Sequence, residues 1–264
     1  MAADRGEALA MDALTEDAFL GGALTILQPK VGYRAGLDAV LLAAALRAGG
    51  NERVLDAGSG VGVAGLAAAR RLPEIEVTLV EQDPHLVDIA RRNIARNGMS
   101  GRARAIAADI TQPLGACPEL HPLAERFDHV LANPPYIVEG RGTAAGDAIK
   151  AAAHAMPPGD LDRWMRFAAS MVRPGGTATL IHRAEALAEV LAALEGRFGD
   201  ARVLPVHPFA GKPASRILVR ATKASRAPMT LLAGIVLHEA DRTFRPEIDA
   251  VLRGGAALDA FPGR

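Results

Sequence analysis

Cysteine is nearly absent from this sequence, and nothing in it has the spacing of a metal site. Cys117 is the single cysteine among 264 residues, which excludes an intrachain disulfide and any site that needs several cysteine ligands. The seven histidines are scattered, without a His-x-Glu pattern or a partner cysteine pair. We therefore predict no metal centre and an inert thiol.

Long hydrophobic runs and net charge are also missing. The best apolar run, residues 37–46, is too short to span a bilayer, and residues 1–16 lack the apolar core of a signal peptide. Lys plus Arg balance Asp plus Glu at 30 each, which argues against a protein that coats nucleic acid by bulk electrostatics, although a local basic patch remains compatible. We predict a cytoplasmic globular protein without a membrane anchor.

Short apolar strands alternate with helical segments along the chain. Strands are expected at residues 54–56, 77–80, 103–110, 127–132 and 177–182, with a closing antiparallel pair at 202–206 and 216–221. Helices are expected at 61–71, 84–97, 161–172 and 184–198, with a turn at 173–176. This repeat predicts a Rossmann-like α/β fold, in which a mostly parallel seven-stranded sheet carries helices on both faces and ends in an antiparallel hairpin.

We divide the chain into a lead-in, residues 1–50, and one catalytic-type α/β domain, residues 51–264. The lead-in carries one expected helix, at 37–46, and is too short for an independent domain. Two stretches resist regular assignment, residues 111–125 and 137–159. Long loops in a compact domain are usually functional or mobile.

Polar and glycine residues follow the first three strands of the predicted domain. Asp56, Gly58 and Gly60 come after the first strand, Glu81 after the second and Asp109 after the third. In open α/β sheets ligands bind beyond the carboxyl ends of the strands, where glycines admit a ligand to the backbone and a carboxylate accepts hydrogen bonds from ribose hydroxyls. Each feature alone has a plain alternative: a packing turn, a solvated glutamate and a loop-capping aspartate. Their conjunction favours a nucleoside cofactor.

The fourth strand ends in Asn133-Pro134-Pro135-Tyr136, the most specific signal in the chain. The two prolines restrict the backbone, so that the Asn133 side-chain carbonyl and the Pro134 main-chain carbonyl can accept two hydrogen bonds from one NH2 group. Tyr136 can stack on a planar substrate. The alternative is a structural Pro-Pro turn capped by Asn133. Beside a cofactor site, this motif indicates methyl transfer to a planar nitrogen by orientation and electrostatics.

These strand-end motifs resemble the cofactor and Asn-Pro-Pro-Tyr sites of class I methyltransferases. Within that class the chain resembles the bacterial tRNA adenine-N6 methyltransferases that modify the anticodon-loop adenosine of valine tRNA, also in the lead-in around Lys30 and Asp38 and in the closing hairpin. The resemblance implies S-adenosyl-L-methionine as cofactor, bound also by Lys30, Asp38 and Asn133, and tRNA as partner. A solvated lysine and a helix-initiating aspartate are the alternatives for the first two.

No acidic residue occurs between Asp200 and Glu239, whereas Lys212 and Arg216 belong to a basic set in that segment. Such a segment can bind RNA phosphates, and we take these two as candidate RNA contacts. Exposed hairpins also carry Lys and Arg to prevent edge pairing, which is the alternative. Arg141 and Lys150, in the loop after Tyr136, can also reach a phosphate.

Other functions stay open at this level. Protein glutamine N5-methyltransferases use the same Asn-Pro-Pro-Tyr logic, but usually carry a separate helical amino-terminal domain, and only some fifty residues precede the first strand here. A non-catalytic module that binds S-adenosylmethionine or RNA is a third hypothesis, and methylation of adenine in DNA a fourth. The sequence identifies neither the RNA nor the oligomeric state.

Overall fold

The computed structural model describes residues 14–31, 34–135, 159–259 and 261. The strands are β1 (Leu14–Phe19), β2 (Leu24–Pro29), β3 (Arg53–Ala57), β4 (Glu76–Glu81), β5 (Ala103–Ala107), β6 (Phe127–Ala132), β7 (Val172–Arg183), β8 (Phe198–Phe209), β9 (Arg216–Lys223), β10 (Thr230–Leu231) and β11 (Ile235–His238). The α-helices are α1 (Leu37–Ala45), α2 (Val63–Arg71), α3 (Pro84–Arg96), α5 (Asp160–Met171), α6 (Leu187–Leu194) and α7 (Pro246–Gly254). Short 3-10 turns are η2 (Leu20–Gly22), η3 (Leu114–Ala116), η4 (His121–Leu123) and η5 (Ala184–Ala186).

One large sheet runs through the molecule in the order β10-β8-β9-β7-β6-β3-β4-β5, with β11 also on β8. The strands from β5 to β7 are parallel, and β9 runs antiparallel between β7 and β8. All seven predicted strands are present in this order, so the predicted Rossmann-like fold with a closing antiparallel hairpin is confirmed. The short strands β10 and β11 extend the sheet beyond β8.

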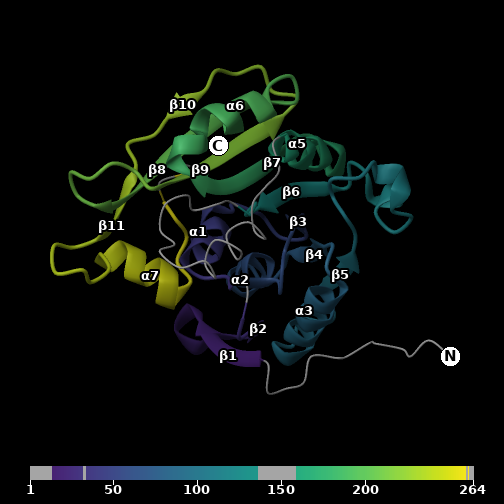
Figure 1. Cartoon of the computed structure of the whole chain (residues 1–264), viewed down its shortest axis with the longest axis horizontal. Helices are drawn as coiled ribbons and strands as arrows, with labels where there is room; N and C mark the ends of the chain where they lie inside the picture. Colours follow the sequence, from purple (N-terminus) through teal and green to yellow (C-terminus); the bar gives the residue numbers. More distant parts are fainter. Residues whose placement is uncertain (1–13, 32–33, 136–158, 260, 262–264) are drawn as a thin grey trace, which may run out of the picture.

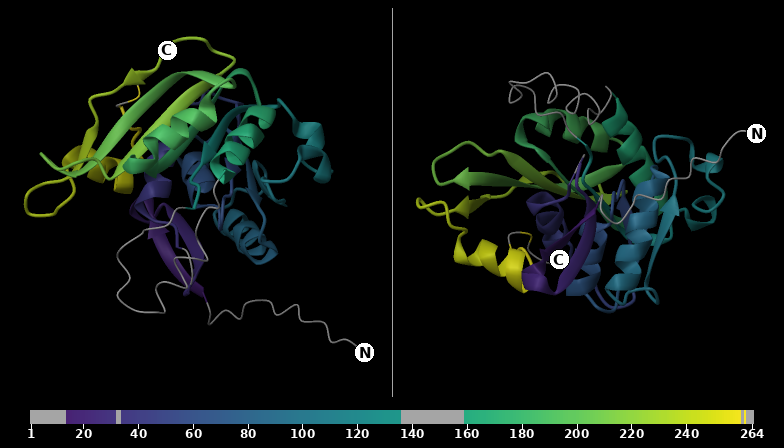
Figure 2. Two further views of the ribbon diagram at one scale, coloured as in Figure 1. Left: turned by 45° about the horizontal axis from the view of Figure 1, so that its top comes forward. Right: turned by 60° about the horizontal axis from the view of Figure 1, so that its bottom comes forward.

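Helices cover both faces of this sheet (Figure 1; Figure 2). The first face is covered by α1, α2, α3 and α7, and the second by α5 and α6, and each layer buries its own apolar cluster. A parallel sheet needs this double cover, because its strands are apolar on both sides. The predicted architecture of helices on both faces is therefore confirmed.

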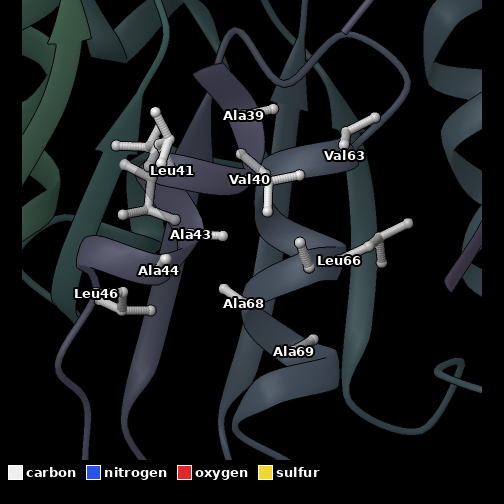
Figure 3. Packing of buried hydrophobic residues seen from close by; sticks show 14 of the residues in the cluster. Ala39, Val40, Leu41, Ala43, Ala44, Leu46, Val63, Leu66, Ala68 and Ala69 are labelled. Atoms are coloured by element: carbon white, nitrogen blue, oxygen red, sulfur yellow. The ribbon is translucent and has the colours of Figure 1, made fainter. Parts of the chain in front are cut away.

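Small side chains allow α1 and α2 to pack closely (Figure 3). Both helices are rich in alanine, and Leu41 and Leu66 are fully buried between them and the sheet. In α2 the position of Gly65 leaves no room for a side chain, since an added Cβ would lie 2.4 Å from Leu79 of β4. The alanine-rich helices 37–46 and 61–71 of the sequence are thus core helices. Within the described residues, no helix combines the length and apolar character that a membrane crossing requires.

The structure differs from the sequence prediction at both ends and in one turn. β1 and β2 form a separate antiparallel hairpin ahead of α1, and α7 follows β11; neither was predicted. The predicted turn at residues 173–176 is wrong, because these residues belong to β7, where the pairing with β6 shifts between Val172 and Thr177. Gly175, with φ of 77°, allows the strand to kink there without ending. The proposed division at residue 50 stays a prediction.

The burial of Leu41 in α1 leads to a prediction about the stability of the folded protein. We expect Leu41→Ala to lower the free energy of unfolding by about 3 kcal/mol, because a fully buried leucine loses its contacts and leaves a cavity. Val31→Ala is the control, since the Val31 side chain is 75% exposed and its truncation should change stability by less than about 0.5 kcal/mol. Denaturant unfolding measures both, and equal losses would contradict this account of the core.

Candidate active site

Three strands end side by side at one edge of the sheet. Ala57, the last residue of β3, pairs with Val80 of β4 and with Ala132, the last residue of β6. Gly58, Glu81 and Asn133 therefore leave the sheet at the same level. The parallel register brings together the strand ends that the sequence placed far apart.

The glycine turn, which we define as residues 56–62, adopts a backbone that few side chains tolerate. Gly58, Gly60 and Gly62 have φ values of 62°, 55° and 93°. The N–H of Ser59 donates to Val80 O at 2.9 Å, and the N–H of Gly60 donates to Glu81 Oε2 at 2.9 Å. These two bonds attach the turn to the end of β4, so its shape is set by the neighbouring strand.

The two glycines at the centre of the turn face different surroundings. A Cβ added to Gly58 would lie 2.2 Å from the ring of Trp164 in α5, so this position is closed by packing. A Cβ added to Gly60 meets no atom within 4 Å. Ser59 Oγ is buried and has no hydrogen-bond partner among the described residues. An open approach to the backbone beside an unused hydroxyl fits a polar, nucleoside-type cofactor.

Asp56 lies beneath the turn and is only 2% exposed. Its carboxylate accepts a hydrogen bond from the Gly65 N–H of α2 at 2.8 Å. Burial raises the pKa of Asp56 to about 7; the Gly65 hydrogen bond opposes this shift and the charge of Glu81 adds to it. Asp56 therefore contacts the start of α2 just after the glycine turn. A direct contact between Asp56 and the cofactor stays a prediction.

Glu81 and Asp109 follow β4 and β5 at the same edge. Glu81 is half-buried, and its Oε1 accepts the N–H groups of Gln82 and Asp83 while its Oε2 accepts that of Gly60. This arrangement fixes the carboxylate next to the turn. We keep the prediction that Glu81 accepts a ribose hydroxyl, because Oε2 accepts one hydrogen bond and keeps a second lone pair.

Asp109 caps its own loop. Its Oδ1 accepts the N–H and hydroxyl of Thr111, at 2.9 Å and 2.7 Å, and its Oδ2 accepts the side chain of Gln112. Burial would raise the pKa of Asp109, but these hydrogen bonds outweigh burial and hold that pKa below its usual value. The capping alternative therefore describes what this carboxylate does in the structure. A contact with the cofactor adenine stays a prediction.

The Asn-Pro-Pro-Tyr motif begins directly after β6. Asn133 is half-buried, Pro134 is buried and Pro135 is exposed, so the chain emerges from the sheet over these three residues. Tyr136 lies outside the described residues, as do Arg141 and Lys150. The motif thus starts beside Gly58, on the neighbouring strand, where the sequence analysis expected it to face the cofactor.

The residues assigned from the lead-in and the closing hairpin meet in one ion pair. Arg216 Nε lies 3.0 Å from Asp38 Oδ2, so a candidate cofactor residue and a candidate RNA residue contact each other. Arg216 pairs with Arg183 at the end of β7, which puts it at the same sheet edge as Asn133. Lys212 is exposed in the turn between β8 and β9, and Lys30 is exposed just after β2. Their roles stay predictions.

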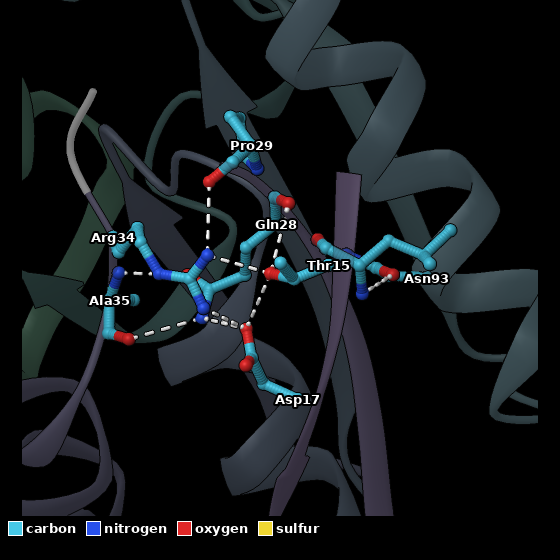
Figure 4. A network of polar contacts seen from close by, with 8 residues as sticks. Thr15, Asp17, Gln28, Pro29, Arg34, Ala35 and Asn93 are labelled. Atoms are coloured by element: carbon cyan, nitrogen blue, oxygen red, sulfur yellow. Dashed lines mark hydrogen bonds and ion pairs between the residues drawn. The ribbon is translucent and has the colours of Figure 1, made fainter. Parts of the chain in front are cut away.

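The connection from β2 to α1 is held by polar side chains (Figure 4). The amide of the buried Gln28 bonds the N–H and the carbonyl of Ala35, and Arg34 contacts Asp17 at 2.6 Å. Arg34 also donates to Thr15 Oγ1 at 2.6 Å. These contacts position the segment that carries Lys30 in front of α1.

The acid-free segment does not form one basic surface. Arg216 and Lys223 stand at opposite ends of β9, about 23 Å apart for an extended strand of this length. Lys223 contacts Glu125 at 2.6 Å, and Arg220 lies over the ring of Phe261. Lys212 and Arg216 are therefore at the end of β9 that reaches the edge carrying the site, and Lys223 is at the opposite end.

His182 is a residue of this edge that the sequence analysis did not single out. It lies two positions beyond Leu180, which pairs with Ala132. Burial lowers the pKa of His182 to about 4, and the positive charges of Arg183 and Arg216 contribute to the shift. The imidazole is therefore neutral at physiological pH. In the sequence, the only feature that could have pointed to His182 as a site residue was its position at the carboxyl end of the predicted strand 177–182.

Among the described residues no cluster of His, Cys, Asp and Glu is suited to a metal ion.

Comparison with known proteins decides the family. A family model described as the methyltransferase small domain matches residues 34–205. The chain belongs to the methyltransferase small domain family. A solved structure described as a predicted O-methyltransferase from Agrobacterium tumefaciens is 34% identical, with a TM-score of 0.71, over 84% of this chain and 98% of that one. The protein is an S-adenosylmethionine-dependent methyltransferase, and its glycine turn suits that cofactor.

Curated relatives divide between two acceptor types. The tRNA1(Val) (adenine(37)-N6)-methyltransferase of Tolumonas auensis is 28% identical over 85% of this chain and 90% of its own length. The release factor glutamine methyltransferase of Chlorobaculum tepidum is 29% identical over 62% of this chain. The match spans only 56% of that protein, and 62% of a Bacteroides thetaiotaomicron relative with the same tRNA methyltransferase description.

Two glycine variants test the turn. We expect Gly60→Ala to weaken S-adenosylhomocysteine binding at least tenfold while lowering the free energy of unfolding by only about 1 kcal/mol, because its methyl enters open space at an unfavourable φ. Gly58→Ala should instead lower the unfolding free energy by more than about 2 kcal/mol, because it collides with Trp164. Calorimetric titration and denaturant unfolding measure these effects. Normal binding by Gly60→Ala would contradict the cofactor assignment.

Asp56 provides a pH prediction. Its pKa is about 7 in the folded chain, against an ordinary value of 3.8 for an aspartate, so between these pH values the folded state holds a proton that the unfolded state has released. The free energy of unfolding must fall as pH rises through this window. Asp56→Asn keeps an acceptor for Gly65 and removes the titration, so its stability relative to the wild type should rise by about 3 kcal/mol between about pH 5 and pH 8. A difference that does not change with pH would disprove the shift.

Proposed function

We propose that this enzyme methylates the exocyclic N6 amine of an adenine in tRNA, at an anticodon-loop adenosine. The observation that carries the proposal is the pairing of Ala57 with Ala132. It puts Asn133 and Pro134 directly beside the glycine turn, so that an amine held by the motif faces the cofactor.

The chemistry of the motif favours nitrogen over oxygen as the acceptor. An aryl NH2 group has two hydrogens, and the carbonyls of Asn133 and Pro134 supply two acceptors for them, whereas a hydroxyl has one hydrogen to donate. Two such bonds draw the nitrogen toward a tetrahedral geometry with its lone pair available. S-adenosylmethionine supplies an electrophilic methyl group when bound. With that cofactor bound, the amine nitrogen would form a bond to the methyl carbon as the carbon–sulfur bond breaks, leaving S-adenosylhomocysteine. The nitrogen would then release one proton to solvent, so no strong base is required.

RNA as the substrate is supported by the relatives and by the residues at the site edge. The tRNA methyltransferase of Tolumonas auensis matches over 90% of its length, whereas the glutamine methyltransferase matches over little more than half. Exposed Lys212, in the β8–β9 turn, and exposed Lys30 provide cations for phosphate contacts. We propose Lys30, Asp38, Glu81 and Asp109 as cofactor-binding residues and Lys212 and Arg216 as RNA-binding residues.

The identity of the methyl acceptor is tested by offering the two candidate substrates separately. Purified enzyme is incubated with radiolabelled S-adenosylmethionine and either unmodified tRNA transcripts, including valine tRNA, or a bacterial release factor. We expect N6-methyladenosine after nuclease digestion of the RNA. Label only in release-factor glutamine would replace the proposal with protein methylation, and label on a hydroxyl or carboxylate would contradict nitrogen transfer.

Asn133 variants test the role of the motif. We expect Asn133→Ala to lower kcat at saturating S-adenosylmethionine about 100-fold, because one acceptor for the amine is lost. Asn133→Asp keeps acceptor oxygens and should retain more activity than Asn133→Ala. Equal kcat values for wild type and Asn133→Ala would rule out this role.

A further inference from the structure

Helix α3 docks the amino-terminal hairpin through two side-chain amides. Asn93 Oδ1 accepts the Leu27 N–H at 2.8 Å, and Asn93 Nδ2 donates to the Leu27 carbonyl at 3.1 Å. One turn later, Asn97 Oδ1 accepts the Thr25 N–H at 3.0 Å, and its Nδ2 donates to the Thr25 carbonyl at 2.8 Å. Each amide therefore satisfies both backbone groups of one β2 residue, as a neighbouring strand would.

The spacing of helix and strand makes this pairing possible. Four residues of an α-helix rise about 6 Å, and two residues of a strand about 6.6 Å. Asn93 and Asn97 thus stand at nearly the same interval as Leu27 and Thr25. β2 pairs with β1 on its other side, so α3 completes the hydrogen bonding of the hairpin without a third strand.

Asn93 makes one contact that Asn97 lacks. Its Nδ2 also donates to the carbonyl of Val61 at 3.0 Å, and the Asn93 side chain is completely buried. Val61 belongs to the glycine turn and follows Gly60, whose N–H is held by Glu81. The second donor of Asn97 bonds the Asn93 carbonyl within α3 instead. One amide therefore joins the hairpin to the turn, and the other only docks the hairpin.

From this difference we infer that Asn93 is a positioning residue for S-adenosylmethionine. It holds Val61 and thereby the backbone of Ser59 and Gly60 in the cofactor-binding shape, and it couples that shape to the docking of β2. A buried amide with three hydrogen bonds loses all of them when truncated, and the carbonyl of Val61 is then left in an apolar layer without its donor. The inference rests on the assignment of the glycine turn to the cofactor, and it is independent of the methyl acceptor.

The matched pair Asn93→Ala and Asn97→Ala tests this role. Both variants remove an amide that docks the hairpin, but only Asn93→Ala releases the turn. We expect Asn93→Ala to weaken S-adenosylhomocysteine binding, measured by calorimetry, and to raise KM for S-adenosylmethionine about tenfold, with kcat at saturation within about twofold of wild type. Asn97→Ala should leave both constants within about twofold. Equal effects of the two variants would overturn the inference.

Amide hydrogen exchange provides a readout that a purely structural role would not change. In the wild type, saturating S-adenosylhomocysteine should slow exchange at Gly60 and Gly62, and also at the Thr25 amide of the hairpin, because coupling between two sites is reciprocal. The Thr25 amide donates to Asn97, which Asn93→Ala leaves in place. In Asn93→Ala the protection at Thr25 on ligand addition should disappear. Persistence of that protection would overturn the coupling.

The outcomes distinguish the assignment of the glycine turn to the cofactor from the positioning role of Asn93. No protection of Gly60 and Gly62 in the wild type would mean that the turn is not the cofactor site, whatever Asn93 does. Protection there, together with normal affinity of Asn93→Ala, would reject only the positioning role. If Asn93→Ala does not fold, Asn93→Ser serves in its place, because its hydroxyl keeps one donor and one acceptor in the same buried position. The same tenfold loss is then expected, since the shorter serine side chain has a single hydrogen and cannot donate to the carbonyls of Leu27 and Val61 together.

Discussion

The active-site edge depends on hydrogen bonds that two strand-end carboxylates accept from the glycine turn and its helix. Glu81, at the end of β4, bonds the N–H of Gly60, and Asp56, at the end of β3, bonds the N–H of Gly65. Backbone N–H groups at the start of a helix have no partner within that helix, so nearby carboxylates stabilise them strongly. The turn thereby keeps a left-handed backbone open to a cofactor. The ends of β4 and β6 flank this turn on either side.

Side-chain amides hydrogen-bond the backbone of the lead-in, as neighbouring strands do within the main sheet. Gln28 bonds both backbone groups of Ala35, and Asn93 bonds both of Leu27. A two-stranded hairpin alone is marginally stable in water, so docking through α3 is what holds it. The Gln28 contacts hold the end of β2 against Ala35, just ahead of α1. The lead-in is joined to the glycine turn by hydrogen bonds as well as by apolar packing.

The proposed RNA substrate would require an enzyme without net charge to use a few well-placed cations. In this chain Arg216 is engaged with Asp38, Lys223 with Glu125, and Arg220 with Phe261. Ion pairing offsets much of the long-range field of Arg216 and Lys223. Phosphate contacts would therefore come from individual exposed residues of the site edge, such as Lys212. Under the proposed function, recognition of the RNA would rest on shape and on the planar acceptor site more than on bulk attraction.

The order of strands and helices was readable from the sequence because apolar periodicity and glycine or proline punctuation are local properties. Strand β6 was predicted with its observed bounds, and the polar residues after each strand were found because parallel strands end at one edge. The β1–β2 hairpin escaped prediction, since its partners, Asn93 and Asn97, come from a helix far along the chain. The sequence also could not show that Asp109 caps its own loop, or that Asp38 pairs with Arg216. By itself the sequence determined the fold class, the cofactor chemistry and the position of the Asn-Pro-Pro motif, all of which follow from local pattern. Only the tertiary structure decided which carboxylates hold the turn and which amide connects it to the lead-in, because hydrogen bonding depends on neighbours that packing brings together.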